Sequence, residues 1–344
     1  ETVLVALGVL ATDTITSKLG LTLGDGNIGW KVIAFVVIVG VVVASGVFGF
    51  KFIMRIQKWI TLASVLLTAV FILLTFSSVN FSVIGSGAAG DFAAVVAGIV
   101  FATTGFGIGW VNGGADYSRY LPRNASGKAI FGWTTFGASI APIVLITYGL
   151  LLALSVPDIG KNIGMDPIGS LTLALPAGAS WFLLPYLLVV LLGFMGGAIL
   201  DIYSSGLNLL TLGLKLKRYQ AASIDGVLMA LGTVYFVFFA SNFFWPFQAF
   251  LYLLGVPMAA WAGIFIADLI QRKKDYDDAS LYKSNGRYGS VNWVTVGVLV
   301  VSSIVGFGFV ASPDTSITWT LWEGYFYKML NITGDNSAWY WSNI

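Results

Sequence analysis

The sequence predicts an all-α integral membrane protein, and three observations carry this prediction. Of the 344 residues, 57% are hydrophobic and only 10% are charged, whereas soluble domains carry about 25% charged residues. The 41 glycines and 12 tryptophans fit membrane helices and their interfaces. Lys and Arg side chains gather in alternate loops between apolar stretches. We therefore expect the lipid bilayer to be the main partner of this chain.

The amino acids that the sequence lacks exclude several types of binding and catalytic site. The chain has no Cys and no His, which excludes disulfides, thiolate or imidazole metal sites and histidine-based catalysis. No phosphate-binding loop or catalytic triad is recognisable, so we predict no enzyme, no cofactor and no metal. The net charge of +2 is spread over short loops and indicates no nucleic-acid partner.

Apolar stretches of about 20 residues are long enough to cross a bilayer. Val3–Ala11 is too short and is predicted to be a partial span. Eight full spans are expected: Lys31–Phe50, Trp59–Phe76, Phe92–Ala115, Ala129–Leu154, Trp181–Gly213, Ile224–Ser241, Phe244–Ile270 and Asn292–Val310. No linker resembles a domain boundary, so residues 1–344 are interpreted as part of a single polytopic domain.

Basic residues predict the orientation. One set of alternate loops contains 14 of the 18 Lys and Arg residues, and loops rich in these residues lie in the cytoplasm. This set comprises Lys51, Arg55, Lys58, Arg119, Arg123, Lys128, Lys215, Lys217, Arg218, Arg272, Lys273, Lys274, Lys283 and Arg287. We therefore expect a multi-pass protein of the cytoplasmic membrane, with residues 311–344 outside.

The span Phe92–Ala115 is rich in glycine around Gly107 and Gly109. Glycine weakens a helix, and transporters bind substrates at breaks in membrane helices. Close helix packing through small residues is an equally good interpretation. Phe106 and Trp110 are spaced i, i+4, so one face could stack on a flat heterocycle, or it could pack against lipid and neighbouring helices.

Acidic residues inside the apolar spans are the second candidate feature. Asp201 follows an uncharged run of twenty residues and is expected about 6 Å from the bilayer midplane. An ionisable group at that depth predicts a role in binding or coupling, although a structural hydrogen bond is the alternative. Glu1 is a second intramembrane candidate if the chain begins inside a span.

Charged residues near the cytoplasmic helix ends favour structural roles. Asp116 and Arg119 are spaced i, i+3 and are predicted to form a local pair with a structural or gating role. Asp268 and Arg272 are spaced i, i+4 and are interpreted as a pair at the end of a helix.

The run from Gly109 to Pro122 contains Gly-Trp, five residues and Asp-Tyr, and ends in Pro. It resembles the purine/cytosine permease branch of the nucleobase–cation symporter family, in which this pattern follows the sixth helix. Three further stretches resemble that branch in the same order, around Phe48–Trp59, Tyr203–Gly213 and Ala260–Trp293.

The resemblance implies a LeuT-like transporter fold with a five-helix inverted repeat. By this resemblance the chain begins within helix three and ends before helix twelve, so it is truncated at both ends. Family members stack the substrate between aromatic residues of helices three and six. This places substrate contacts around Phe106–Trp110, and Glu1 matches a polar position on helix three.

The matching eighth helix departs from the family pattern. Gly197, Ala198, Ile199 and Leu200 stand where many members have asparagines, and Phe182–Leu200 contains no Ser or Thr, the side chains that bind sodium in coupled members. Proton coupling through Glu1 or Asp201 is therefore expected in preference to sodium coupling.

The sequence thus predicts proton-coupled symport of a nucleobase (cytosine or a purine) or a related heterocycle by alternating access. A carrier of allantoin, hydantoin, uracil, a vitamin-like heterocycle or an amino acid is the first alternative. A channel or a membrane-embedded enzyme is the alternative from another class, although neither repeated pore-lining polar residues nor clustered catalytic groups are evident.

Overall fold

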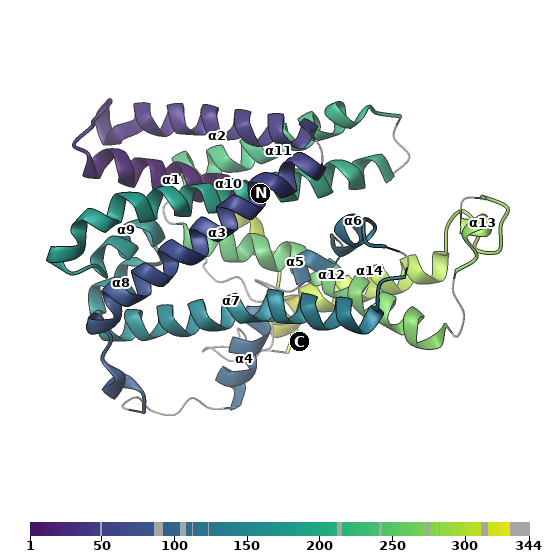
Figure 1. The fold of residues 1–344 in the computed structure, drawn as a ribbon. Coiled ribbons are helices and arrows are strands. Elements are labelled where there is room, and N and C mark those ends of the chain that lie inside the picture. The colour runs from purple at the N-terminus through teal and green to yellow at the C-terminus, as the bar shows by residue number, and fades with distance from the viewer. Residues whose placement is uncertain are drawn as a thin grey trace. The chain divides into compact units, whose positions relative to one another are not determined.

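The computed structural model contains two compact units, both built from helices in the part of the chain that it describes (Figure 1). Unit 1 comprises Glu1–Gly87 and Pro122–Phe244, and unit 2 comprises Ala88–Leu121 and Trp245–Ile344. The described residues are 1–48, 50–85, 92–103, 108–111, 113–122, 124–211, 215–240, 243–272, 276–281, 283–310 and 316–330.

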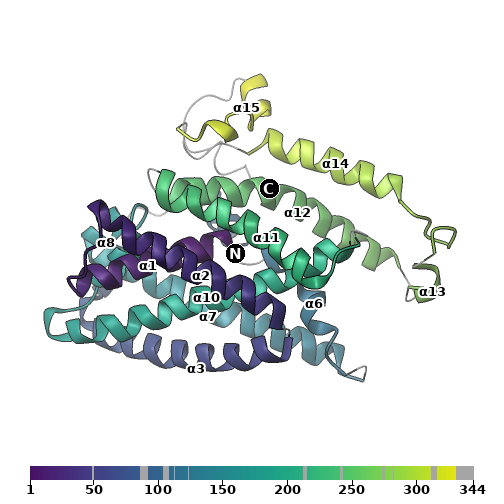
Figure 2. The same ribbon diagram turned by 90° about the horizontal axis from the view of Figure 1, so that it is seen from above.

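In unit 1, helix α10 packs against four other helices. It contacts α1, α2, α3 and α11, and the two ribbon views agree on this bundle (Figures 1 and 2). The helices of this unit are α1 (Thr2–Lys18), α2 (Ile28–Phe48), α3 (Phe50–Thr75), α7 (Gly127–Ser155), α8 (Pro157–Asn162), α9 (Pro167–Leu173), α10 (Leu183–Thr211) and α11 (Arg218–Val234). A short π-helical segment, Tyr235–Phe239, continues α11.

Unit 2 contains one long helix, one of intermediate length and several short ones among its described residues. They are α4 (Phe92–Ala102), α5 (Gly109–Val111), α6 (Gly114–Ser118), α12 (Phe244–Gln271), α13 (Asp278–Leu281), α14 (Trp293–Gly308) and α15 (Tyr325–Met329). The backbone N–H of Gly324 donates to the carbonyl of Phe307 at 2.9 Å. This bond joins the segment before α15 to the end of α14.

Six helical segments among the described residues are long and apolar enough to cross a membrane. They are Asp25–Gly46, Phe52–Ser78, Gly127–Ser155, Ala177–Thr211, Arg218–Phe239 and Phe244–Gln271. Six of the eight predicted full spans are therefore confirmed as long helices. Asn292–Val310 corresponds to α14, an apolar helix of 16 residues. The continuity of Phe92–Ala115 is not tested, because part of this span lies outside the described residues.

Three helix boundaries were predicted too narrowly, because polar residues continue a helix further than hydropathy suggests. Helix α1 runs on to Lys18, beyond Ala11, and Thr12 and Thr14 donate their hydroxyls to carbonyls one turn earlier, at 3.0 Å in each case. Helix α3 begins at Phe50, so Lys51, Arg55 and Lys58 are helical residues. Helix α11 begins at Arg218, almost two turns before the predicted start at Ile224.

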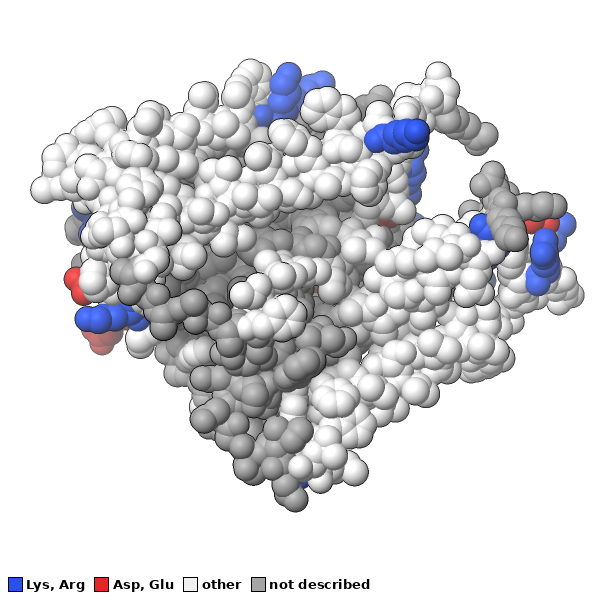
Figure 3. All heavy atoms as spheres, turned by 90° about the horizontal axis from the view of Figure 1, so that it is seen from below, with Lys and Arg blue, Asp and Glu red and all other residues white. Residues whose placement is uncertain are grey.

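The outward faces of the long helices are apolar. In α7, Phe131 and Trp133 are each 74% exposed and Ile143 is 60% exposed. Figure 3 shows one face on which most described atoms belong to uncharged residues. Exposure of large apolar side chains on this scale is unfavourable in water and is expected where lipid surrounds the helices.

Unit 1 is held together at one end by aromatic packing. The rings of Phe71 and Tyr186 stack with their centroids 4.3 Å apart, and Phe182 stacks on the other side of the Tyr186 ring at 5.8 Å. Beside them, the hydroxyls of Thr75 and Tyr148 are 2.6 Å apart and share a hydrogen bond. These contacts fix α3, α7 and α10 against one another.

Candidate functional site

Two adjacent glycines in the middle of α10 let its neighbours approach closely. A Cβ atom at Gly196 would lie 2.7 Å from the side-chain oxygen of Gln57 in α3, and one at Gly197 would lie 2.8 Å from Leu4 in α1. Gly196 and Gly197 therefore serve packing. They bring the beginning of α1 against the middle of α10.

This close approach places Glu1 beside Asp201. The backbone nitrogen of Glu1 lies 2.9 Å from Asp201 Oδ2, and the two side chains are 15% and 29% exposed. Glu1 precedes α1 and Asp201 lies ten residues before the end of α10. The structure thus brings together two residues that the sequence places two hundred positions apart.

Asp225 is a third acidic residue at this site, and the sequence analysis did not identify it. Asp225 lies on the buried face of α11 and is only 7% exposed. Its carboxyl lies within hydrogen-bonding reach of the Glu1 carboxyl. The predicted span began at Ile224, which made Asp225 look like a residue of the helix end. The usable signal was the run from Arg218 to Gln220, which caps and begins α11.

The carboxyls of this cluster are incompletely satisfied. Glu1 Oε2 and Asp225 Oδ2 are buried and have no hydrogen-bond partner. A buried carboxylate without donors is strongly disfavoured. The cluster therefore has room for a bound proton, because a protonated carboxyl would supply the missing donor.

In the described part of the chain, no Lys or Arg side chain forms an ion pair with these three acidic residues. Arg218, on the same helix as Asp225, donates to the carbonyl of Gly46 at 3.2 Å and lies over the ring of Tyr203. Within the same described residues, no three His, Cys, Asp or Glu side chains have an arrangement that could hold a metal ion. The site is acidic and its charge is not balanced by a cationic side chain.

A break in the glycine-rich span stays a prediction, because residues 104–107 and 112 lie outside the described residues. Helix α4 ends at Ala102, and α5 begins at Gly109. Phe106 and Gly107, two of the predicted substrate contacts, lie outside the described residues. Gly109 has open space where a Cβ would be, and the Trp110 side chain is 47% exposed. An exposed indole ring offers a stacking surface, but its role in binding stays a prediction.

The charged residues near helix ends have local partners. Arg119 follows α6 and donates to the Tyr120 hydroxyl at 3.0 Å, while Asp116 lies in the first turn of that helix. Their mutual pairing stays a prediction. The pair at the end of α12 is confirmed, because Arg272 donates two hydrogen bonds to Asp268, at 2.7 and 3.0 Å.

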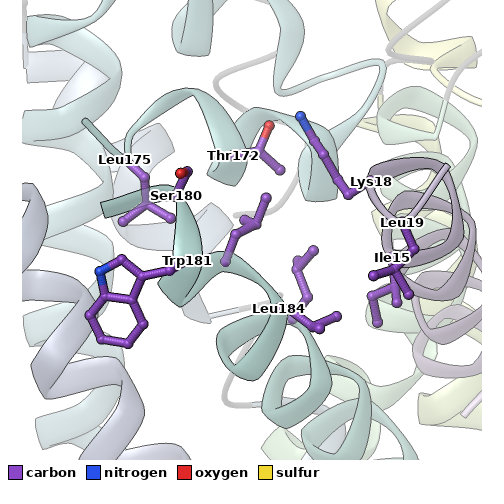
Figure 4. A pocket seen from close by; sticks show the side chains of 10 residues that line it. Ile15, Lys18, Leu19, Thr172, Leu175, Ser180, Trp181 and Leu184 are labelled. Carbon is purple, nitrogen blue, oxygen red and sulfur yellow. The ribbon is translucent and has the colours of Figure 1, made fainter. Parts of the chain in front are cut away.

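A pocket of about 440 Å³ lies at the other end of α1, where it meets α9 and the beginning of α10 (Figure 4). Its lining includes Lys18, Thr172 and Ser180, and Trp181 stands at one side. Lys18 is 17 residues from Glu1, which is about 25 Å along a helix. This pocket is therefore separate from the carboxyl cluster.

The sequence is similar to known membrane permeases. The model of a family described as permease for cytosine/purines, uracil, thiamine, allantoin matches residues 1–329. A Bacillus subtilis strain 168 protein named "Putative purine-cytosine permease YxlA" is 30% identical over 203 residues, which are 57% of this chain and 42% of that relative. The matched region thus spans about two fifths of the relative's length.

No solved structure matches the chain. The family match covers nearly all of the sequence, and it agrees with the resemblance seen around Gly109–Pro122. Together with six helices able to cross a bilayer, it shows that this multi-pass membrane chain belongs to the family of permeases for cytosine, purines, uracil, thiamine and allantoin.

Proposed function

We propose that this chain belongs to a secondary active transporter of the cytoplasmic membrane that imports a nucleobase or a related heterocycle together with protons. The family description and the name of the Bacillus relative support a heterocyclic substrate. The absence of catalytic motifs in the sequence favours transport over an enzymatic reaction.

The observation that carries proton coupling is the meeting of Glu1 and Asp201 beside Asp225. Asp201 and Asp225 belong to helices of the apolar bundle and Glu1 precedes α1, and ionisable residues at such positions are typical of proton pathways. Sodium coupling has less support, because Phe182–Leu200 of the α10 segment provides no hydroxyl side chain. Protons are therefore the preferred coupling ion.

Each part of the site has a proposed role. The glycine-rich pattern, with Phe106, Gly107, Gly109 and Trp110, is proposed from the sequence to hold the heterocycle by stacking and backbone contacts. Glu1 and Asp201 bind the substrate edge and couple it to protons. Residues 1–344 act as one transport domain that alternates its access between the two sides of the membrane.

Asp116 and Arg119 lie at the predicted cytoplasmic end of the glycine-rich span, where we assign them a structural or gating role. Asp116 is in the first turn of α6 and Arg119 caps its end. Both residues belong to the run that resembles the permease family most closely.

A second substrate class is favoured by one observation. Gly197 packs against Leu4 where many family members have asparagines, so this part of α10 offers no side-chain amide to the edge of a base. The substrate would then be a heterocycle other than cytosine or adenine, such as allantoin, hydantoin, uracil or a vitamin-like ring.

Uptake in cells expressing the complete gene tests these proposals. A potential of about 100 mV supplies about 2.3 kcal/mol per proton, enough for roughly 50-fold accumulation. We expect radiolabelled cytosine or adenine to accumulate, to be released by a protonophore and to be unaffected by removing sodium. Sodium-dependent uptake would overturn proton coupling. Uptake of neither base by protein shown to reach the membrane would favour the second substrate class.

A further inference from the structure

We infer that Glu1 and Asp225 form a proton-binding pair in which the two carboxyls share one proton, with Asp225 as the member nearer the cytoplasm. This inference deepens the proposed function, on which its transport consequence rests. Neither the family pattern nor the sequence analysis pointed to Asp225.

The first argument is burial without a donor. Asp225 is more than nine-tenths buried, and its Oδ2 atom has no hydrogen-bond partner. Glu1 Oε2 is in the same condition. Two carboxylates have only acceptor oxygens. The close approach of the Glu1 and Asp225 side chains is therefore favourable when one of them carries a proton and donates it to the other.

The second argument comes from the charged groups on the elements packed against α11, which are α1, α2, α10 and the π-helical segment. Helix α10 contributes Asp201 as its single charged residue, and the π-helical segment has none. Lys31 of α2 pairs at 3.3 Å with Asp13 of α1, at the far ends of those helices.

On α11 itself, Arg218 is two turns from Asp225 and is engaged with Gly46 and Tyr203. The nearby charges are therefore acidic, and like charges in close contact favour a shared proton over two ionised carboxylates.

The third argument is depth. Asp201 lies ten residues before the end of α10 at Thr211, which is about 15 Å of helix. Asp225 lies seven residues after the beginning of α11 at Arg218, which is about 10 Å. With the orientation that the basic loops predict, both of these helix ends face the cytoplasm. The carboxyls then form a descending series from Asp201 and Glu1 to Asp225.

This arrangement provides two states that differ by one proton. With the proton present, the O–H of one carboxyl donates to the other, and the pair holds α1 against α11. Release of the proton leaves two carboxylates in contact, and their repulsion separates the two helices. The proton thereby becomes linked to the packing of α1 against α11.

The test compares Asp225→Asn with Asp166→Asn in purified protein and in membrane vesicles. Asp166 is a matched control because it caps α9 by accepting from the backbone of Gly169, and Asn caps equally well. Infrared spectroscopy at neutral pH uses a Glu323→Gln background, because burial raises the pKa of Glu323 to about 7. This reference protein should show the carbonyl stretch of a protonated carboxyl. We expect Asp225→Asn to abolish that band and Asp166→Asn to keep it.

Transport provides the second readout, with radiolabelled cytosine as the probe. For Asp225→Asn we expect accumulation driven by a pH gradient to fall from roughly 50-fold to about 1-fold, while exchange of internal for external cytosine without a gradient continues. Asp225→Glu, which keeps a carboxyl, should restore both the infrared band and part of the accumulation.

The outcomes separate this inference from the proposed function. An infrared band that is absent in the reference protein, or unchanged in a folded Asp225→Asn protein, would overturn the shared proton. A second outcome is a band that is present and is lost in Asp225→Asn, together with wild-type uptake that a protonophore does not change. That outcome would support the shared proton and would contradict proton coupling. If Asp225→Asn does not fold, the comparison of Glu1→Gln with the reference protein gives the same infrared decision.

Discussion

Asp268 in unit 2 and Asp225 in unit 1 differ in what neutralises them. In unit 2, Asp268 at the end of α12 receives two hydrogen bonds from Arg272 and one from the Tyr276 hydroxyl. In unit 1, Asp225 is buried and lacks a cationic partner. A carboxylate paired at a helix end needs no further ligand, whereas a buried carboxyl without a donor indicates a proton. Burial and pairing together therefore distinguish a structural acid from a functional one.

The largest expected effect separates Asp201 from Asp268. In Asp201→Asn, we expect proton-driven accumulation of substrate to drop from roughly 50-fold to a few-fold, because the carboxyl beside Glu1 is lost. In Asp268→Asn, we expect near wild-type accumulation, since exposed pairs contribute little. Radiolabelled uptake with and without protonophore measures both variants. Full pH-driven uptake by Asp201→Asn would remove this residue from the coupling site.

The next effect concerns packing near the carboxyl cluster. A Cβ at Gly226 in α11 would lie 2.5 Å from Val43 Cγ2, and a β-branched side chain cannot easily turn away. Gly226→Ala should therefore lower stability by about 1–3 kcal/mol. Gly40→Ala is the control, because Gly40 has open space around it and alanine favours a helix by up to about 1 kcal/mol. Equal thermal-unfolding midpoints in detergent would contradict the tight α2–α11 contact.

A third prediction concerns pH and Glu323, which lies outside the membrane-spanning segments. Burial raises the pKa of Glu323 to about 7, from 4.5, and neither carboxyl oxygen has a hydrogen-bond partner. The folded state therefore favours the protonated form. Its stabilisation is complete below about pH 4.5 and is lost as the pH rises through about 7. Unfolding midpoints of the wild type should fall over this range, and those of Glu323→Gln should change less.

Asp277 provides a control of opposite sign. Ser280 donates a hydrogen bond that lowers the pKa of the exposed Asp277 carboxyl, so its contribution is lost as the pH falls. Asp277→Asn should leave the decline between pH 4.5 and 7 in place. A wild-type midpoint that does not vary over that range would show that Glu323 is not buried as described.

The smallest effect is expected at the paired acid of unit 2. Arg272→Gln removes both hydrogen bonds to Asp268, but the pair is local and partly exposed, and such pairs near the surface contribute little to stability. We expect no measurable change in the unfolding midpoint or in uptake. A clear loss of uptake would show that Asp268 belongs with the functional acids, and would weaken the distinction between the two units.

Long apolar runs were sufficient to predict six of the spans, because a continuous helix is the only way to satisfy their backbone in lipid. A break at the glycines between Ala102 and Gly109 was one of two interpretations of the glycine pattern, and both stay predictions. Hydropathy failed at α1 and α11, where polar residues bond within the helix and extend it. Asp225 was missed for this reason, since its depth depends on a helix that begins at Arg218.

Contacts between distant segments were beyond prediction from one sequence. Asp201 was identified because an uncharged run precedes it, but nothing in the sequence indicated that Glu1 would lie beside it. Their proximity depends on Gly196 and Gly197, whose small size lets α1 and α3 approach α10. In the sequence Gly197 was only a departure from the family pattern, and Gly196 was not singled out.

Arg218 contributes both to the loop charge that predicts the membrane orientation and to the packing of the helices. Its guanidinium donates to the Gly46 carbonyl in the last turn of α2 and lies over the Tyr203 ring of α10, so one side chain clamps three helices. Removing this side chain would change the positive charge that predicts the orientation and would also remove contacts among three helices. A charge-reversal experiment at Arg218 could therefore not separate an effect on membrane insertion from an effect on folding. Lys215, which is exposed in the same loop, is the residue at which the topology of this protein can be mapped without disturbing its fold.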